Sequence, residues 1–356
     1  MDKYQQKIDF SFKTNQQIIK LVSTIDAYKG RWNLVEQKEN IPLKELRNIA
    51  TIQSIGASTR IEGSQLSDEE IKNLLNNLKI SKLSTRDEQE AVGYYDVLEL
   101  IYENFDAINL SQNFIKQLHQ KLLKYSTKDE RHRGNYKNVS NEVIAEYPDG
   151  IKKIIFKPTE PHLVEIELSD LIDWTNKQLE AEEIHPLILI GLFVYEFLSI
   201  HPFQDGNGRL SRLLTSLLLL QHHYQFIKYI SFENYIEQKK KSYYEALMEG
   251  QKNRLTNSEV IESWILFFLH SIENLTQKLD QKYNSFRSKG GYLNERQKLI
   301  VDYITRNQPV KLADLVNALE NTSINTLKKD LQYLKTEKII EAIGKNKGTV
   351  YSIKAK

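Results

Sequence analysis

The distribution of apolar and polar residues predicts a chain made mainly of helices. The strongest signal is a pair of apolar segments, residues 186–200 and 213–220, which are separated by a short polar stretch. The first has the length of a buried helix, and Pro186 suits the first helical position. We expect this helix to end just before Pro202, because the residue before a proline is pushed out of the helical region. A second buried helix is expected to begin at about Arg209.

Apolar residues at helical spacing predict further helices along most of the chain. The region before residue 86 is helical in pattern, and Ser67-Asp-Glu-Glu70 resembles a capping box at a helix start. Later helices are expected at residues 91–102, 114–125, 163–182, 231–235, 239–247 and 259–275. These patterns predict a fold that is mainly α.

One short region departs from the helical pattern. Residues 139–145 and 151–156 are β-prone runs that flank Tyr147-Pro-Asp-Gly150. Pro-Asp-Gly between two such runs is a turn signal, because proline presets the first turn position and glycine accepts a positive φ. We therefore expect a β-hairpin.

The last part of the chain has its own succession of elements. The preceding residues 277–291 are polar and end in two glycines, which is typical of a linker or a connecting helix. Three helices and then a two-stranded ribbon resemble a winged helix-turn-helix domain. The three helices are expected at residues 293–306, 311–319 and 323–336, and the β-prone runs lie at residues 339–343 and 349–353.

Composition places the chain among globular proteins. It has 356 residues, of which 40% are hydrophobic and 27% charged, and it has no cysteine. This length leaves room for two or three domains, and the absence of cysteine excludes disulfides and thiol chemistry. The N-terminus lacks the apolar core of a signal peptide, and no apolar run reaches the length of a membrane span. We expect a cytoplasmic protein that does not bind membranes.

The C-terminal region is more basic than the rest. From Gly291 to Lys356 there are twelve Lys and Arg residues against seven Asp and Glu, although the whole chain has a net charge of only +2. Lysines could meet DNA phosphates, but the third helix has no arginine of the kind that reads guanine. DNA binding and protein docking or dimerisation therefore both stay open for this region. The lysines concerned are Lys328, Lys329, Lys335, Lys345 and Lys347.

The polar stretch between the two buried helices, from His201 to Arg212, carries the candidate chemistry. Gly206-Asn207-Gly208 lets backbone N–H groups converge just before a helix N-terminus, which is an anion site. Arg209 and Arg212 stand three residues apart, so we expect both to face one anion.

Two further side chains of this stretch suit phosphate chemistry. Asp205 is placed to hold a hard metal ion against the anion, and His201 can take a proton near neutral pH. Together they indicate a polyphosphate with its metal, beside a base that activates a nucleophile.

The stretch from His201 to Arg212 resembles the signature of the Fic family, His-Pro-Phe-x-Asp/Glu-Gly-Asn-Gly-Arg-x-x-Arg, at every defined position. The resemblance implies a helical bundle with a hairpin flap and a protein adenylyltransferase, which moves AMP from ATP to a Ser, Thr or Tyr hydroxyl. By that resemblance His201 is the general base and Asp205 binds Mg²⁺. The ATP-binding residues it implies are Gly206, Asn207, Gly208, Arg209, Leu210, Ser211 and Arg212, with Asn138, Val139, Ser140 and Asn141 beside the flap and Tyr243 or Tyr244 near the adenine.

A second motif lies nearer the N-terminus. Ser58-Thr-Arg-Ile-Glu62-Gly63 is by itself a helix that ends in glycine. It also resembles the Fic inhibitory motif Ser/Thr-x-x-x-Glu-Gly/Asn, in which Glu62 would pair with Arg212 and block productive ATP binding. Some family members use this glutamate to activate water that removes AMP, and that alternative stays open.

These interpretations predict an N-terminal helical region with an inhibitory helix, a Fic core, a linker and a winged-helix-like domain. The flap is expected to pair with the backbone of the target protein as an added strand. The alternative function is a DNA-binding regulator whose Fic domain senses a nucleotide. Transfer of phosphate, UMP or phosphocholine, and assembly as a homodimer, also stay open. The predicted boundaries are residues 1–85, 86–276, 277–291 and 292–356.

Overall fold

The computed structural model divides the chain into two compact units, one of residues 1–38 and 46–279 and one of residues 39–45 and 280–356. It describes residues 3–37, 41–78, 83–146, 152–256, 258–288, 293, 295–319, 322–336, 339–344 and 348–354.

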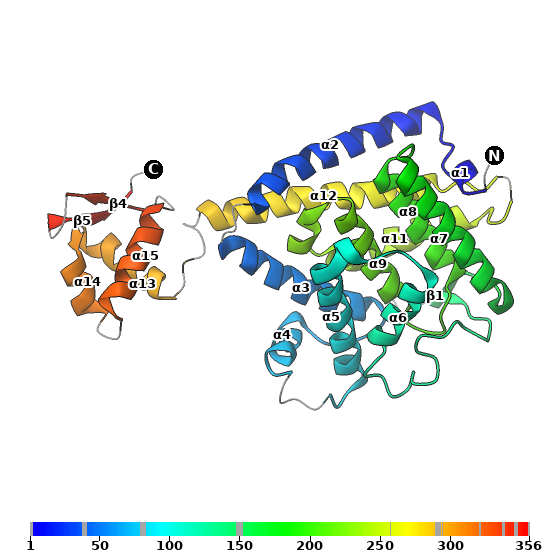
Figure 1. The fold of residues 1–356 in the computed structure, drawn as a ribbon, viewed down its shortest axis with the longest axis horizontal. Coiled ribbons are helices and arrows are strands. Elements are labelled where there is room, and N and C mark those ends of the chain that lie inside the picture. The colour runs from blue at the N-terminus through cyan, green and yellow to red at the C-terminus, as the bar shows by residue number, and fades with distance from the viewer. Residues whose placement is uncertain are drawn as a thin grey trace. The chain divides into compact units, whose positions relative to one another are not determined.

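The first half of the larger unit is helical (Figure 1). The capping box predicted at Ser67 is confirmed, because its side chain accepts from the backbone of Glu70 while the Glu70 carboxylate accepts from the backbone of Ser67. The elements are α1 (Lys3–Lys7), α2 (Phe12–Glu36), α3 (Ile41–Ile61), α4 (Asp68–Asn76), α5 (Arg86–Asn104), the 3-10 turn η1 (Phe105–Ala107) and α6 (Gln112–Leu122).

The second half adds one hairpin and the most apolar helices. The strands pair antiparallel, with an irregularity between Val143 and Ile144. The turn predicted at Tyr147-Pro-Asp-Gly150 lies outside the described residues. The elements are β1 (Val143–Glu146), β2 (Lys152–Phe156), η2 (Pro161–Leu163), α7 (Val164–Ala181), α8 (Pro186–Ile200), α9 (Asn207–Gln221), η3 (Gln225–Tyr229), α10 (Phe232–Gln238), α11 (Lys240–Gln251) and α12 (Glu262–Ser288).

Helices α8 and α9 form the centre of the larger unit. The prediction of a buried helix at residues 186–200 is confirmed, since nearly every α8 side chain is buried. α8 packs against α7 and α9, and Trp264 of α12 donates a hydrogen bond from Nε1 to the Gly191 carbonyl at 2.7 Å. α12 continues to Ser288, so the start of the region expected as a linker or connecting helix is helical.

The smaller unit has the succession of elements expected for a winged helix, with one addition. A two-residue strand, β3, precedes the second helix and makes the sheet three-stranded and antiparallel in the order β3-β5-β4. Its core is formed by buried aliphatic residues from Leu293 to Ile340. The elements are α13 (Glu295–Asn307), β3 (Val310–Lys311), α14 (Leu312–Ala318), α15 (Ile324–Thr336), β4 (Ile340–Ile343) and β5 (Val350–Ile353).

Two further predictions concern the wing lysines and membrane-spanning helices. Lys345 and Lys347, expected at the tip of the wing, lie outside the described residues. Within the described ranges, no helix combines the length and apolar character needed to cross a bilayer.

Candidate functional site

The site is built on the loop between α8 and α9. His201 ends α8 in a left-handed conformation (φ 51°), and its N–H donates to the Phe197 carbonyl at 2.9 Å. The Asn207 amide closes the loop from inside, donating to the Phe203 carbonyl at 2.7 Å and accepting from the Phe203 N–H at 2.9 Å. Gly206 (φ 82°) caps α9, which therefore begins two residues before the position expected from the sequence.

His201 is held as a neutral base. Its Nδ1 lies 3.3 Å from the Leu198 carbonyl, which can only accept, so Nδ1 carries the hydrogen and Nε2 keeps its lone pair. Burial, and then the positive charge of Lys137, lower the pKa of His201 to about 4. At neutral pH the ring is therefore ready to accept a proton at Nε2.

Lys137 holds the backbone on both sides of His201. Its N–H donates to the Pro202 carbonyl at 2.9 Å, and its Nζ donates to the Ile200 carbonyl at 3.3 Å. The same Nζ donates to Asn141 Oδ1 at 2.9 Å, which ties the start of the flap to this loop. Burial lowers the pKa of Lys137 to about 8. Lys137 was not predicted from the sequence, because the carbonyls that it binds are far away in the sequence.

His119 of α6 supports the other end of the loop and was also missed. Its Nε2 lies 2.9 Å from the Asp205 carbonyl, and its Nδ1 accepts from the Gly134 N–H at 2.9 Å. The ring stacks on Phe203, with centroids 3.8 Å apart. Burial lowers the pKa of His119 to about 4, so the ring is neutral and fixed in one tautomer.

Two arginines and two carboxylates alternate in a closed ring around the start of α9. Arg209, which is fully buried, contacts Glu90 at 2.9 Å and Asp205 at 3.0 Å. Arg86 contacts the same two carboxylates, at 2.6 Å and 3.3 Å. Burial opposes the charge of Asp205, but Arg209, the Gly206 N–H and Arg86 together lower its pKa. Arg86 and Glu90 were not predicted from the sequence.

Arg212 is bound by residues at the end of α3. Its Nε donates to Ser58 Oγ at 2.8 Å, and its Nη2 donates to the Ser58 carbonyl at 2.9 Å and to Glu62 Oε1 at 2.8 Å. Ser58 and Glu62 are four residues apart and so share one helix face. The structure thus contains the Glu62–Arg212 ion pair that the resemblance implies.

The Glu62 carboxylate also occupies the first turn of α9. A Cβ added at Gly208 would lie only 2.3 Å from Glu62 Oε1 and 3.2 Å from Arg212 Nη1. Because a helix N-terminus attracts anions, Glu62 fills a position that suits a phosphate group. Only glycine at 208 allows the carboxylate to come this close.

The end of α3 is fixed in place. Gly63 (φ 106°) is the left-handed residue of a Schellman motif, in which the Ser64 N–H donates to the Thr59 carbonyl and the Gly63 N–H to the Arg60 carbonyl. Arg60 binds Glu237 of α10 through two hydrogen bonds, of 2.7 Å and 3.0 Å. These contacts hold Glu62 against α9.

One expectation about the arginines is wrong. Arg209 and Arg212 do not face one anion, because carboxylates on different elements draw them apart. Arg209 turns towards Asp205 and Glu90, whereas Arg212 turns towards Glu62.

The other residues predicted to bind ATP occupy varied positions. Leu210 is fully buried, and Ser211 donates to the Gly208 carbonyl at 2.8 Å. Tyr243 packs edge-on against Trp264 and Tyr244. Burial, with Arg212 opposing and Glu62 adding to it, raises the pKa of Tyr243, so this ring lies near the Glu62–Arg212 pair. Asn138, Val139 and Ser140 are exposed at the approach to the flap.

The described residues contain no group of three or more His, Cys, Asp or Glu residues that could hold a metal ion. Asp205, however, offers a partly exposed carboxylate beside a helix N-terminus. Mg²⁺ commonly binds one or two carboxylates and takes its remaining ligands from substrate phosphates and water. The chemistry of Asp205 therefore fits Mg²⁺ bound together with a nucleotide.

Comparisons with known proteins agree with this geometry. The chain is 26% identical over 211 residues to the protein adenylyltransferase Fic of Aedes aegypti, covering 55% of this chain and 39% of that protein. It is 28% identical over 167 residues to the protein adenylyltransferase fic-1 of Caenorhabditis elegans, covering 45% and 30%. The chain thus spans well under half the length of these curated relatives.

A solved structure of a Fic family protein from Desulfovibrio desulfuricans matches with a TM-score of 0.67 at 21% identity, covering 98% of both chains. A Fic-domain signaling protein from Bacteroides thetaiotaomicron matches with a TM-score of 0.61 at 24% identity, covering 76% of this chain and 99% of that one. At these identities the likeness establishes the fold. The family model for Fic/DOC matches residues 109–219, which include the loop and the start of α9. The chain therefore contains a domain of the Fic/DOC family.

Proposed function

We propose that this protein transfers AMP from ATP to a hydroxyl side chain of a target protein. The observation that carries the proposal is the placing of a neutral histidine, His201, beside a helix N-terminus that is built to receive phosphate. The names of the curated relatives, which are adenylyltransferases, support the same chemistry.

In the proposed reaction, the target hydroxyl oxygen attacks the α-phosphorus of ATP. The bond from the α-phosphorus to the bridging oxygen breaks, and pyrophosphate leaves. The hydroxyl proton passes to His201 Nε2, the nitrogen that the Leu198 contact leaves with its lone pair. Phosphoryl-type transfer depends mainly on positioning and charge stabilisation, which the N–H groups at the start of α9 and Arg212 would supply.

Asp205 would hold Mg²⁺ with the phosphates, where the ion neutralises charge on their oxygens. Lys137 and His119 would hold the α8–α9 loop in place, since they bind the backbone carbonyls of Ile200, Pro202 and Asp205. The β1–β2 hairpin would present its edge to the backbone of the target as an added strand.

We also propose that Glu62 inhibits the resting enzyme. The carboxylate occupies both Arg212 and the first turn of α9, so the terminal phosphates of ATP would have to displace it. Arg212 is almost fully buried, whereas Glu62 is one-third exposed. The pair therefore falls between an exposed pair, worth up to about 1 kcal/mol, and a buried one, whose loss costs about 3–5 kcal/mol.

The nucleotide and the transferred group can be tested together. The full chain carrying Glu62→Gly is incubated with an extract of its source and ATP labelled at either the α- or the γ-phosphate. AMP transfer predicts that label from the α position alone depends on His201, so that it is lost when His201→Ala is added. Label from the γ position that is lost in the same way would instead indicate phosphate transfer and would overturn the proposal.

A further inference from the structure

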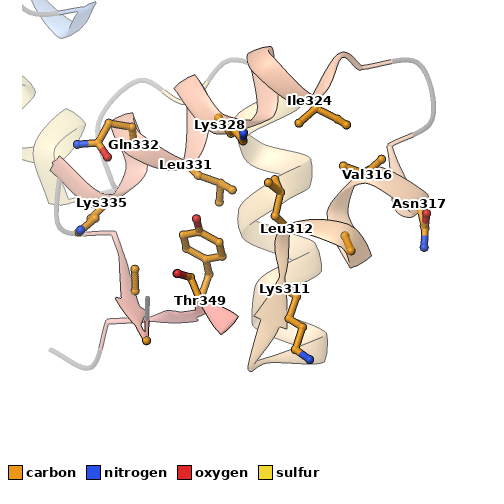
Figure 2. Close-up of a pocket in the computed structure, with 14 residues that line it drawn as sticks. Lys311, Leu312, Val316, Asn317, Ile324, Lys328, Leu331, Gln332, Lys335 and Thr349 are labelled. Atoms are coloured by element: carbon orange, nitrogen blue, oxygen red, sulfur yellow. The ribbon is translucent and has the colours of Figure 1, made fainter. Parts of the chain in front are cut away.

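The smaller unit contains an open groove that the proposed transfer chemistry does not use. It has a volume of about 1050 Å³ and lies between the start of α14, one face of α15 and the β4–β5 ribbon. Figure 2 shows Leu312 and Leu331 pointing into it from α14 and α15. It is large enough to accept several side chains of a partner.

The floor of the groove is apolar. Leu312, Val316 and Tyr351 are packed on the core of this unit but stay partly exposed, and Leu331 lies beneath them. At one end Ile324 leaves half of its surface exposed to water. An apolar floor of this kind gains free energy when apolar side chains cover it.

The rim of the groove is basic. Lys311, Lys328 and Lys335 lie on different sides of it (Figure 2), and among the described residues that line it there is no acid. Asp330 and Asp314, which stand next to lining residues in the sequence, have partners elsewhere. Asp330 binds Arg296 of α13, and the Asp314 carboxylate caps α14 by accepting from the Lys311 N–H.

The spacing along α15 fits a helix laid beside it. Ile324, Lys328, Leu331 and Lys335 recur at intervals of three and four residues and so share one face. Lys328 and Lys335 are two turns apart, about 10 Å along the axis. Acidic residues two turns apart on a partner helix would meet both lysines while its apolar face covers the floor.

From the apolar floor and the basic rim we infer that this groove docks an acidic, amphipathic helix of a partner protein. Charge complementarity selects the acidic partner, and the concave apolar floor selects a protein helix. A nucleic acid could meet the lysines, but its charged backbone would leave the floor without an apolar partner. The inference does not depend on the transfer chemistry of the other unit.

The test uses the full chain and a fluorescein-labelled peptide of about four helical turns, roughly 14 residues, with Leu at helical spacing and Glu elsewhere. Two matched peptides replace every Glu by Lys or every Leu by Ser. Anisotropy should report saturable binding of the acidic amphipathic peptide only, because both the charge and the apolar face are needed.

The groove is located by matched variants. Lys328→Glu/Lys335→Glu should weaken binding at least about ten-fold, and Ile324→Asp should weaken it too. Lys329→Glu/Lys354→Glu makes the same change of charge outside the groove and should leave affinity within about two-fold. A thermal melt checks folding, and Lys328→Gln/Lys335→Gln replaces the charge reversal if that variant does not fold.

Three results would overturn the inference. The first is an acidic peptide that shows no saturable binding, and the second is a groove variant that binds as well as its control. The third is unlabelled duplex DNA that binds more tightly and displaces the peptide, which would make this face a nucleic-acid site.

Discussion

Glu62 Oε1 lies 2.8 Å from Arg212 Nη2 and against the backbone of Gly208, so one carboxylate occupies both the cation and the helix N-terminus of the site. A phosphate group bound at this helix N-terminus would need the same two partners. In the proposed function, productive ATP binding and the Glu62 contact are therefore alternatives, and the contacts that hold α3 in place should set the resting activity.

Arg60→Ala should raise AMP transfer, because Arg60 anchors the end of α3 to Glu237 and to Asp68. Loss of these contacts loosens α3, but the Glu62 carboxylate is retained and can still bind Arg212. The gain should therefore be several-fold and smaller than that of Glu62→Gly. The measurement is the initial rate of incorporation of label from the α-phosphate. Arg47→Ala, on the same helix with a longer 3.7 Å ion pair, is the control. Equal rates in both variants would show that the anchor has no part in inhibition.

Lys137→Met should move the acidic limb of the pH profile to higher pH. Lys137 is the charge that lowers the pKa of His201 to about 4, after burial, while Glu62 and Asp205 act in the opposite direction. Without Lys137, the pKa should rise towards the ordinary value of about 6.5. The profile of kcat/KM is measured in the Glu62→Gly background, with exposed Lys177→Met of α7 as the control. A variant that is slower at every pH with an unmoved limb would assign Lys137 a structural role alone.

The buried His119 should make the fold less stable in acid. Its folded pKa of about 4 lies below the ordinary value of about 6.5, so between these pH values the unfolded chain binds a proton that the folded chain does not. Stability should therefore fall as pH drops through this window, by up to about 3 kcal/mol from this group. His201 adds a contribution of the same sign.

The stability of wild type and His119→Gln is compared by urea unfolding between pH 7 and pH 4.5. The variant should be less stable at pH 7 and should lose less on acidification, whereas exposed His132→Gln should follow wild type. Parallel curves for wild type and His119→Gln would contradict the assignment of a neutral, buried ring.

Glu90→Ala should destabilise the fold by about 3 kcal/mol, because it leaves the fully buried Arg209 with one carboxylate in place of two. Urea unfolding measures the change. Glu103→Ala, on the same helix but exposed, should cost less than about 0.5 kcal/mol. A loss for Glu90→Ala no larger than that control would mean that the charge ring does not stabilise the site.

The sequence predicts most helices because their periodicity is local. The buried α8 and the capping box of α4 follow from residues that lie within a few turns of each other. The strand β3 was not predicted, since two residues are too few to show an alternating pattern. The start of α9 was misplaced by two residues, because Gly206 and not Gly208 is its cap.

The site can be predicted only in part, because a local pattern does not reveal contacts between distant residues. The motif residues His201, Asp205 and Arg212 can be found from their spacing, but their direction depends on partners far away in the chain. Glu90, which binds Arg209, and Lys137, which holds the backbone on both sides of His201, are such distant residues, and neither stands in a motif. The divergence of the two arginines follows from carboxylates that no local pattern places beside them.

The most direct test of the account is intact-mass spectrometry of three proteins after incubation with ATP, Mg²⁺ and an extract of the source. These are wild type, Glu62→Gly and Glu62→Gly/His201→Ala. Glu62→Gly should add the mass of an adenylyl group to itself or to an extract protein about 10- to 100-fold faster than wild type. This factor corresponds to an inhibitory Glu62–Arg212 contact of roughly 1–3 kcal/mol. The double variant should add none. No adenylyl group on any protein with Glu62→Gly, or equal addition with and without His201, would contradict it.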